Sequence, residues 1–339
     1  MKRLLTTLLK VGISAAIIGY LVWNSTRGAK NVNVFANLCN QQKDWTLLAL
    51  AWVCCAAAVL LTFIRWWFLV RALEIPCRFA DGIRIGFWGY LFNLAPLGIV
   101  AGDLVKAVML DHEHRGYRAK ALASVLVDRI LGLYVLFVVA TVAILLTGFS
   151  QTDKPVIRWV CNLTYFLTIV GTIALGVLLG PDLSDGRLTR MLGLIPRVGP
   201  PLESLVLAVR MYRHKPLVLT LSAVGTIPVH SLFAIGCWLI ACGLPDNHPT
   251  LAQHFVIMPL SSALGVVPLA MGPMEAGVDL LYTAVPVAGR AIVAGQGLVV
   301  VLVYRLITVL IAAMGAYYYF GNRREMAEVI HETEEEKSG

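Results

Sequence analysis

An apolar run over residues 83–110 is long enough to cross a lipid bilayer, yet helix-breaking residues interrupt its middle. Pro96 removes a backbone hydrogen bond and Gly102 weakens helical structure. Asp103 and Lys106 then place charges at bilayer depth, where irregular, polar backbone persists only if protein or a wet cavity surrounds it. The run therefore predicts a re-entrant hairpin that enters the membrane, turns near the midplane with Pro96 and Gly102 as its hinge, and leaves through a second helix opened by Gly102 and Asp103.

Composition indicates that the rest of the chain is also a membrane protein. Hydrophobic residues make up 58% and charged residues 14% of the 339 residues, whereas a soluble domain has about 25% charged residues. Basic loops next to anionic lipid account for the net charge of +8. We therefore expect membrane phospholipid, and not nucleic acid, as the partner. The seven cysteines include no Cys-x-x-Cys pair, so we expect neither a metal nor a cofactor.

Hydropathy predicts an all-α polytopic membrane protein with six spanning helices and two re-entrant hairpins. A crossing needs about 20 apolar residues, and the first apolar segment has no cleavage site that would make it a signal peptide. The second hairpin is predicted over 255–287, with Pro268 and Gly272 as its hinge. A single transmembrane domain would cover 1–320, followed by a charged cytoplasmic tail over 321–339. The predicted spans are 5–23, 46–70, 119–147, 157–180, 216–243 and 291–320.

The distribution of lysine and arginine predicts the orientation of these segments. Basic residues collect in alternate loops, which places both termini in the cytoplasm. The chain then divides into repeat one, about 46–147, and repeat two, about 216–320, with opposite topology. Inverted repeats with broken helices are typical of transporters. The connector over 181–215 is expected to contain an interfacial amphipathic helix that begins near Pro200.

Repeat one contains four candidate substrate-binding residues: Asp103, Lys106, Asp128 and Arg129. Asp103 and Lys106 are three residues apart and share a helix face. Asp103 could cap its helix while Lys106 reaches the interface, or both could contribute to a phosphate site at a helix N-terminus. Asp128 and Arg129 point about 100° apart on a helix, so each needs a partner elsewhere. Asp103 and Lys106 are the nearest candidates, and a structural ion pair is the alternative to substrate contact.

Repeat two places Arg305 near the middle of a span, too deep to reach water easily. Glu275 is its expected partner, because Gly272, Pro273 and Glu275 form a helix-start pattern with a glycine cap, proline next and glutamate at the third position. A structural Glu275–Arg305 pair and direct substrate contact remain alternatives. Tyr304 and His230 are nearby candidates. Arg65, next to two tryptophans, is predicted to be an interfacial residue whose guanidinium reaches the membrane surface.

These residues resemble the lysylphosphatidylglycerol synthase transmembrane, or flippase-like, family. The resemblance rests on Asn93–Pro96, Gly102–Lys106, the Asp128–Arg129 pair, Pro268–Glu275 and Arg305, in that order along nearly the whole chain. It implies an integral inner-membrane protein connected with lipid translocation. Larger members carry a cytoplasmic aminoacyltransferase domain that makes the lysyl lipid. This chain has no room for it, so we do not expect it to be the synthase.

The sequence departs from the family pattern at three positions. Ala101 stands where a second glycine is usual, Lys106 where arginine is usual, and Met271 in a segment where the family has a serine and paired glycines. These departures leave the lipid preference open.

Three functions fit these observations. The first is translocation of a phospholipid or a lipid-linked anionic substrate between leaflets, with Lys106, Arg129 and Arg305 guiding the phosphate. The second is secondary transport of a small anionic solute by the same architecture. The third is an accessory membrane enzyme of lipid or glycan modification, with Asp103 or Glu275 as acid–base. We expect the first, a transporter and not an enzyme, because charged residues lie at two broken helices of opposite topology.

Overall fold

The computed structural model describes an α-helical protein with no strand among the described residues. Five of its helices are long and apolar enough to cross a membrane, which confirms five of the six predicted spans. They are α3 (Trp45–Ala72), α6 (Arg118–Thr147), α7 (Pro155–Leu179), α10 (Pro216–Gly243) and α13 (Gln296–Gly321). The structure describes residues 2–27, 38, 40, 42–93, 99–151, 153–179, 199–244, 247–267, 269, 271–285 and 292–321. The predicted tail and most of the predicted connector lie outside these ranges.

The segment predicted as the first span lies within α1 (Lys2–Arg27). Only residues 12–25 of this helix form an apolar stretch in the described part of the chain, shorter than the stretches in the five long helices. This helix packs beside α12 (Pro273–Ala284).

Helices α3 and α10 form the centre of the molecule and pack along each other more extensively than any other described pair. Their contact is close because small residues line it. A side chain at Gly236 would meet the Cys55 sulfur at 2.8 Å, and one at Gly243 would meet Leu48. Helix α3 begins at a cap in which the Asp44 carboxylate accepts hydrogen bonds from the amides of Thr46 and Leu47.

Neither interrupted run forms one continuous helix. The first run is divided into α4 (Phe79–Phe92) and α5 (Ile99–Glu113), which pack against each other. The second is divided into α11 (Leu251–Ala263), the short 3-10 helix η2 (Leu264–Val266) and α12. The four α-helices contain 14, 15, 13 and 12 residues, or roughly 18–22 Å each at 1.5 Å per residue. The apolar core of a bilayer is about 30 Å thick, so each is too short to cross it upright.

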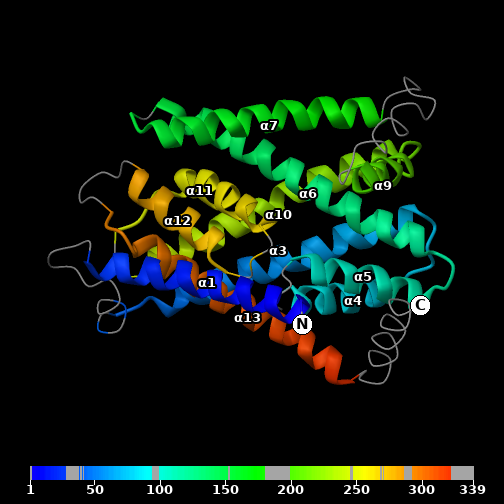
Figure 1. The fold of residues 1–339 in the computed structure, drawn as a ribbon, viewed down its shortest axis with the longest axis horizontal. Helices are drawn as coiled ribbons and strands as arrows, with labels where there is room; N and C mark the ends of the chain where they lie inside the picture. Colours follow the sequence, from blue (N-terminus) through cyan, green and yellow to red (C-terminus); the bar gives the residue numbers. More distant parts are fainter. Residues whose placement is uncertain are drawn as a thin grey trace.

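The two helix pairs lie toward opposite ends of the long axis of the molecule. Figure 1 shows α4 and α5 at one end and α11 and α12 at the other, with α3 and α10 running between them. Each pair packs against a long helix from the other half of the chain, since α4 contacts α13 and α11 contacts α6. The hydrophobic core follows this division, with one cluster around α4, α5 and α9 and another around α11, α12 and α13.

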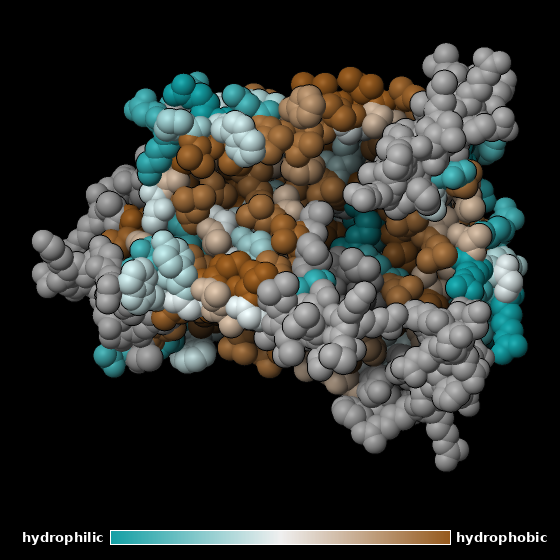
Figure 2. All heavy atoms as spheres, viewed as in Figure 1, coloured by the Kyte–Doolittle hydropathy of each residue, from teal (hydrophilic) through white to brown (hydrophobic). Residues whose placement is uncertain are grey.

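The surface supports the assignment to a membrane. Figure 2 shows a broad hydrophobic band between more hydrophilic ends. Much of the apolar surface of α7 is exposed, including Trp159, Phe166 and Ile173. A short helix, α9 (Gly199–Arg210), begins close to the predicted start of the amphipathic segment and buries Val206 and Val209.

Candidate functional site

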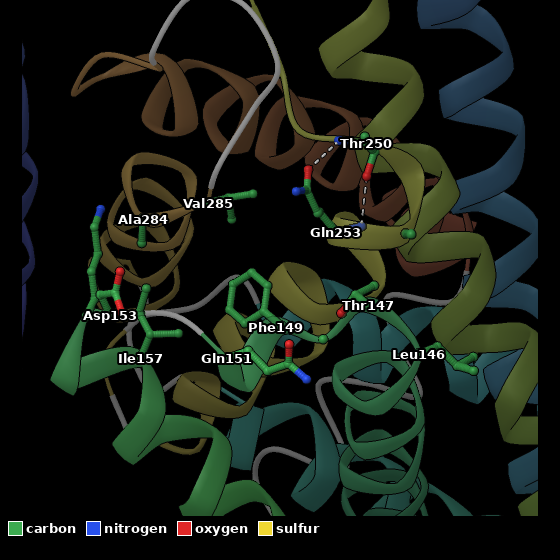
Figure 3. A pocket seen from close by; sticks show the side chains of 13 residues that line it. Leu146, Thr147, Phe149, Gln151, Asp153, Ile157, Thr250, Gln253, Ala284 and Val285 are labelled. Carbon is green, nitrogen blue, oxygen red and sulfur yellow. Dashed lines mark hydrogen bonds between the residues drawn. The ribbon is translucent and has the colours of Figure 1, made fainter.

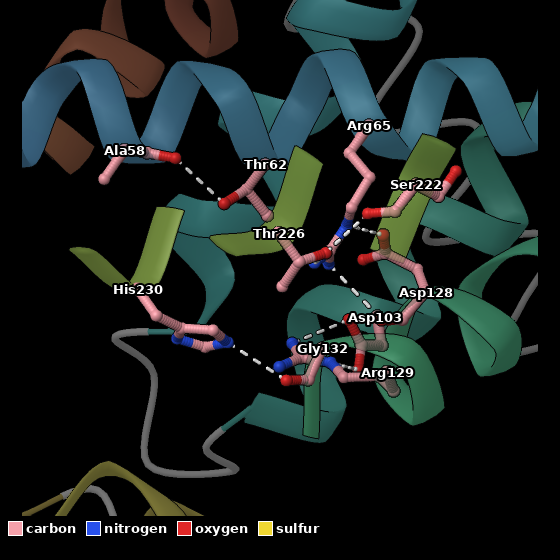
Figure 4. Close-up of polar contacts among 10 residues, drawn as sticks. All are labelled: Ala58, Thr62, Arg65, Asp103, Asp128, Arg129, Gly132, Ser222, Thr226 and His230. Atoms are coloured by element: carbon pink, nitrogen blue, oxygen red, sulfur yellow. Dashed lines mark hydrogen bonds and ion pairs between the residues drawn. The ribbon is translucent and has the colours of Figure 1, made fainter. Parts of the chain in front are cut away.

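Arg129 of α6 binds the Asp103 carboxylate of α5 through two hydrogen bonds. Its Nε donates to Oδ2 at 2.5 Å and its Nη2 to Oδ1 at 2.9 Å. Figure 4 shows the two side chains facing each other. The Arg129 side chain remains 41% exposed, and a hydrophilic patch interrupts the hydrophobic surface in the region between α5 and α6 (Figure 2). This confirms the predicted pairing of Arg129 with Asp103.

Asp103 lies one turn inside α5 and does not open it. The helix begins at Ile99, so the expectation that Gly102 and Asp103 start the second half-helix was wrong. Gly102 has a packing role instead, because a side chain there would collide with the Gly89 carbonyl oxygen of α4. Glycine allows two backbones to approach this closely. Pro96, the other predicted hinge residue, lies outside the described residues.

Lys106 lies one turn further along α5 and is buried. Its ammonium lies 5.3 Å from the centre of the Trp66 ring and 5.9 Å from that of Phe63, both on α3. Its aliphatic stem crosses α4 at Gly89, where a side chain would meet the Lys106 carbons at 2.7 and 2.8 Å. The ammonium makes no hydrogen bond or ion pair with any described residue. Of the two alternatives for Lys106, the one in which it reaches the interface was therefore wrong.

Asp128 has a different partner from the predicted ones. Arg65 of α3 donates from Nε to Asp128 Oδ1 at 2.8 Å and from Nη1 to Thr226 Oγ1 of α10 at 2.8 Å, and both charged side chains are buried. Figure 4 shows Arg65 pointing from α3 toward these two residues. Arg65 thus joins the three helices and is not an interfacial residue, contrary to the prediction. Nearby, His230 of α10 donates from Nε2 to the carbonyl oxygen of Gly132 at 3.0 Å.

Glu275 and Arg305 form the second predicted ion pair. Arg305 Nε of α13 donates to Glu275 Oε1 at 2.6 Å, and Glu275 is fully buried. The other carboxylate oxygen accepts the backbone N–H of Gly272 at 2.7 Å. This is the predicted start of α12, with Gly272 before the helix, at a φ of 115° that favours glycine, and Pro273 at its first position. Pro268, the other predicted hinge residue, lies outside the described residues.

Two further buried residues lie on the two helices that carry this pair. Tyr304 is buried and packs edge-on against Phe233 of α10. Asp279, which sequence reasoning missed, is also buried, and its Oδ1 accepts the amides of Gly295 at 2.9 Å and Leu298 at 3.1 Å. It therefore caps the first turn of α13 from a neighbouring helix. An acidic residue within an amphipathic helix was the available signal, but its partners lie 16 and 19 residues further along.

A cavity of about 680 Å³ lies at the end of α6, away from both ion pairs. Figure 3 shows Phe149, Gln151 and Gln253 around it. The Gln253 side chain accepts the Thr250 amide at 2.8 Å, and the Thr250 hydroxyl accepts the Gln253 amide, so these two residues cap α11. None of the predicted site residues lines this cavity.

The region of α5, α6 and α3 is therefore the candidate functional site. It combines a partly exposed arginine, the carboxylate paired with it and a buried lysine that forms no ion pair with any described residue, all within an apolar helical framework. A guanidinium that binds a carboxylate through two parallel hydrogen bonds can bind a phosphate in the same way. The arrangement is suited to binding an anionic group at the surface of a membrane protein.

Comparison with known families identifies the family of the chain. The family model described as the lysylphosphatidylglycerol synthase TM region matches residues 7–315. No curated protein and no solved structure matches the chain. The match covers most of the 339 residues and includes both helix pairs and both ion pairs, as the resemblance in the sequence predicted. This multi-pass membrane protein therefore belongs to the lysylphosphatidylglycerol synthase transmembrane-region family.

Proposed function

We propose that the protein translocates a phospholipid, or another lipid-linked anionic substrate, between the two leaflets of the membrane. One observation carries the proposal. In each interrupted run, a carboxylate forms an ion pair with an arginine on the long helix that follows. The pairs are Asp103 with Arg129 in one half of the chain and Glu275 with Arg305 in the other. The two arginines would guide the headgroup phosphate, with Lys106 adding a further basic group beside Asp103, while the acyl chains stay in the bilayer.

The contacts between helices support an inverted repeat. If α3, α4, α5 and α6 correspond to α10, α11, α12 and α13, then the contact of α4 with α13 corresponds to that of α11 with α6, and both are present. The contact of α5 with α6 likewise corresponds to that of α12 with α13. The central pair of α3 and α10 maps onto itself. Such a pattern is expected when two repeats are related by a two-fold axis.

The short helices support two re-entrant hairpins. Each of α4, α5, α11 and α12 is too short to cross the hydrocarbon core, and the two pairs lie toward opposite ends of the molecule (Figure 1). Hairpins that open toward opposite leaflets would each bring an ion pair toward the middle of the membrane. A headgroup could then pass from one pair to the other.

The exposure of Arg129 favours a lipid over a small solute. The Arg129 side chain is 41% exposed and belongs to a helix that is long and apolar enough to cross the membrane. A lipid headgroup could reach this side chain from the side while the acyl chains remain in the bilayer. A small solute requires an aqueous path through the protein instead. The acid–base role considered for Asp103 finds less support, because both of its oxygens already accept hydrogen bonds from Arg129.

Reconstitution tests the proposal. Vesicles that contain the purified protein and a fluorescent, dithionite-quenchable phospholipid should lose the protected inner-leaflet signal faster than empty vesicles. Arg129→Gln should slow this loss by about tenfold, equivalent to roughly 1.4 kcal/mol, because it removes the guanidinium that binds the phosphate. Arg118→Gln is the matched control, since Arg118 is exposed at the first turn of α6, and it should retain the wild-type rate. Equal rates in protein-containing and empty vesicles would reject lipid translocation.

A further inference from the structure

The charged groups around Arg129 do not balance. Arg65 and Asp128 neutralise each other, as do Arg129 and Asp103. Lys106, which follows Asp103 by three residues on α5 and stacks against Trp66, is the third basic group of this cluster. With its ammonium protonated, the cluster has two negative and three positive groups, and therefore a net charge of +1. No described residue forms an ion pair with the Lys106 ammonium, and a buried ammonium without an anion is costly. This site is therefore suited to receive one negative charge.

Lys106 is too deeply buried to be the first point of contact for a ligand. It is 5% exposed, whereas the Arg129 side chain is 41% exposed. A phosphate that approaches from the surface therefore meets Arg129 first. Arg129 is already occupied by Asp103, so the anion can bind fully only if this carboxylate moves to another cation.

Lys106 is placed to accept that carboxylate. It follows Asp103 by three residues on α5, and side chains at this spacing lie next to each other on a helix. If the Asp103 side chain rotates toward its own helix, its carboxylate would leave Arg129 and bind Lys106. After the exchange, Arg129 binds the phosphate, Lys106 binds Asp103, and every charge in the cluster has an opposite partner.

We propose that Lys106 is a reserve partner for Asp103, which allows Arg129 to exchange this carboxylate for a phosphodiester that carries one negative charge. This inference rests on the proposed function and specifies its substrate class. A phosphodiester lipid whose headgroup adds no further charge supplies the one negative charge that neutralises the cluster. Lys106 acts here as a positioning residue, because it binds Asp103 and not the substrate.

The Glu275–Arg305 pair lacks the residues that this exchange requires. Val278, three residues after Glu275, occupies the position that corresponds to Lys106. The second oxygen of Glu275 is also bound to the Gly272 amide, so moving this carboxylate would break the start of α12. The exchange is therefore assigned to Asp103 and Arg129 alone, and the two halves of the protein differ in how they bind an anion.

Binding of phosphatidylmethanol, a phosphodiester lipid with one negative charge and a minimal headgroup, tests this inference. Its apparent dissociation constant can be measured by native mass spectrometry of the full chain in detergent micelles. Lys106→Met should weaken binding by about tenfold, because the released Asp103 then has no cation. Lys120→Met is the matched control, since Lys120 stacks on Tyr117 at the start of α6, and it should bind like the wild type.

A double variant separates the exchange from direct contact. In Asp103→Asn combined with Lys106→Met, no carboxylate has to leave Arg129, so binding should return to within about threefold of the wild type. If the double variant binds as weakly as Lys106→Met, Lys106 contacts the phosphate itself and the exchange is overturned. Wild-type affinity in Lys106→Met also overturns it. Circular dichroism and melting of each variant confirm that it is folded.

A water-soluble phosphodiester separates this inference from the proposed function. Dimethyl phosphate has the same charge and linkage as the lipid headgroup but no acyl chains, so it should bind far more weakly than phosphatidylmethanol. Equal affinity for the two compounds would overturn lipid as the source of the phosphodiester. If the variants behave as expected but vesicles show no lipid translocation, the exchange stands and the proposed function fails.

Discussion

Arg65 and Asp128 form a buried ion pair between α3 and α6, with Nε and Oδ1 2.8 Å apart and both side chains less than a tenth exposed. The Arg65 guanidinium also binds the hydroxyl of Thr226 on α10 and the Asp128 carbonyl oxygen. The central pair of helices is thereby fixed to the helix that carries Arg129, the neighbour of Asp128. This relationship sets the position of the candidate anion site.

Loss of Arg65 should strongly destabilise the protein. Arg65→Met leaves the buried carboxylate of Asp128 without a cation, and breaking a buried pair on one side costs about 3–5 kcal/mol. The free energy of unfolding in mixed micelles, measured against increasing sodium dodecyl sulfate, would show this loss. Combining it with Asp128→Leu should recover most of the stability, because no unpaired charge remains. An Arg65→Met protein as stable as the wild type would contradict the structural role of the pair.

Gly102 should not tolerate even a methyl group. In Gly102→Ala the new Cβ would collide with the Gly89 carbonyl oxygen and the Asn93 side chain, so α4 and α5 must separate. Overpacking of this kind costs about 1–3 kcal/mol, measurable in the same unfolding assay. Gly225→Ala on α10 is the matched control, because its Cβ would meet no atom within 4 Å. It should gain up to about 1 kcal/mol from helix propensity. Equal effects at the two positions would refute close packing at Gly102.

The local patterns of the sequence predicted much of this structure. Runs of apolar residues predicted five long helices with ends within about five residues of those observed, since hydropathy and helix length are linked by the thickness of the bilayer. The breaks in both interrupted runs and the start of α12 at Gly272, Pro273 and Glu275 were also predicted, because proline and glycine act locally. The Glu275–Arg305 pair followed, since few other partners exist at that depth.

The partners of Arg65 and Asp279 could not be predicted in the same way. Arg65 lies beside two tryptophans, as an interfacial residue does, and only the rotation of α3 about its axis turns it toward Asp128, 63 residues away. Asp279 binds amides across the end of a different helix. Both relationships depend on how helices pack, and no spacing within one helix specifies that. The start of α5 at Ile99 was missed because Gly102 serves packing and does not mark a boundary.

The pair of Glu74 and Lys215 should make stability depend on pH at one end of the molecule. Lys215 donates to the Glu74 carboxylate at 3.1 Å and also to the carbonyl oxygen of Ala72. The hydrogen bond and the charge of Lys215 lower the pKa of Glu74 below its ordinary value of 4.5. A folded pKa below the unfolded one stabilises the fold at higher pH, and this contribution is lost as the pH falls through the folded pKa.

Glu74→Gln should therefore lower the melting temperature slightly near pH 7 but have little effect well below the folded pKa, where Glu74 is protonated in both states. Because Glu74 is exposed, the effect should be small and should shrink in 1 M salt, which screens surface charges. Melting curves of both proteins from pH 7 to pH 3 would test this expectation. A difference that grows as the pH falls would show that the pair does not stabilise the fold.

Asp279 should be required for the start of α13, the helix that carries Arg305. Its carboxylate accepts the amides of Gly295 and Leu298 within the protein, and Gly295 has a φ of 97° that keeps the chain turned into the helix. Asp279→Ala leaves both buried amides without an acceptor and should cost about 2 kcal/mol. Asp279→Asn keeps a side-chain oxygen at the same place and should cost less than about 1 kcal/mol. The free energies of unfolding of the two variants show whether Asp279 stabilises α13 through its hydrogen bonds or through its negative charge. Equal destabilisation would mean that the negative charge at the helix N-terminus, and not the hydrogen bonds, stabilises α13.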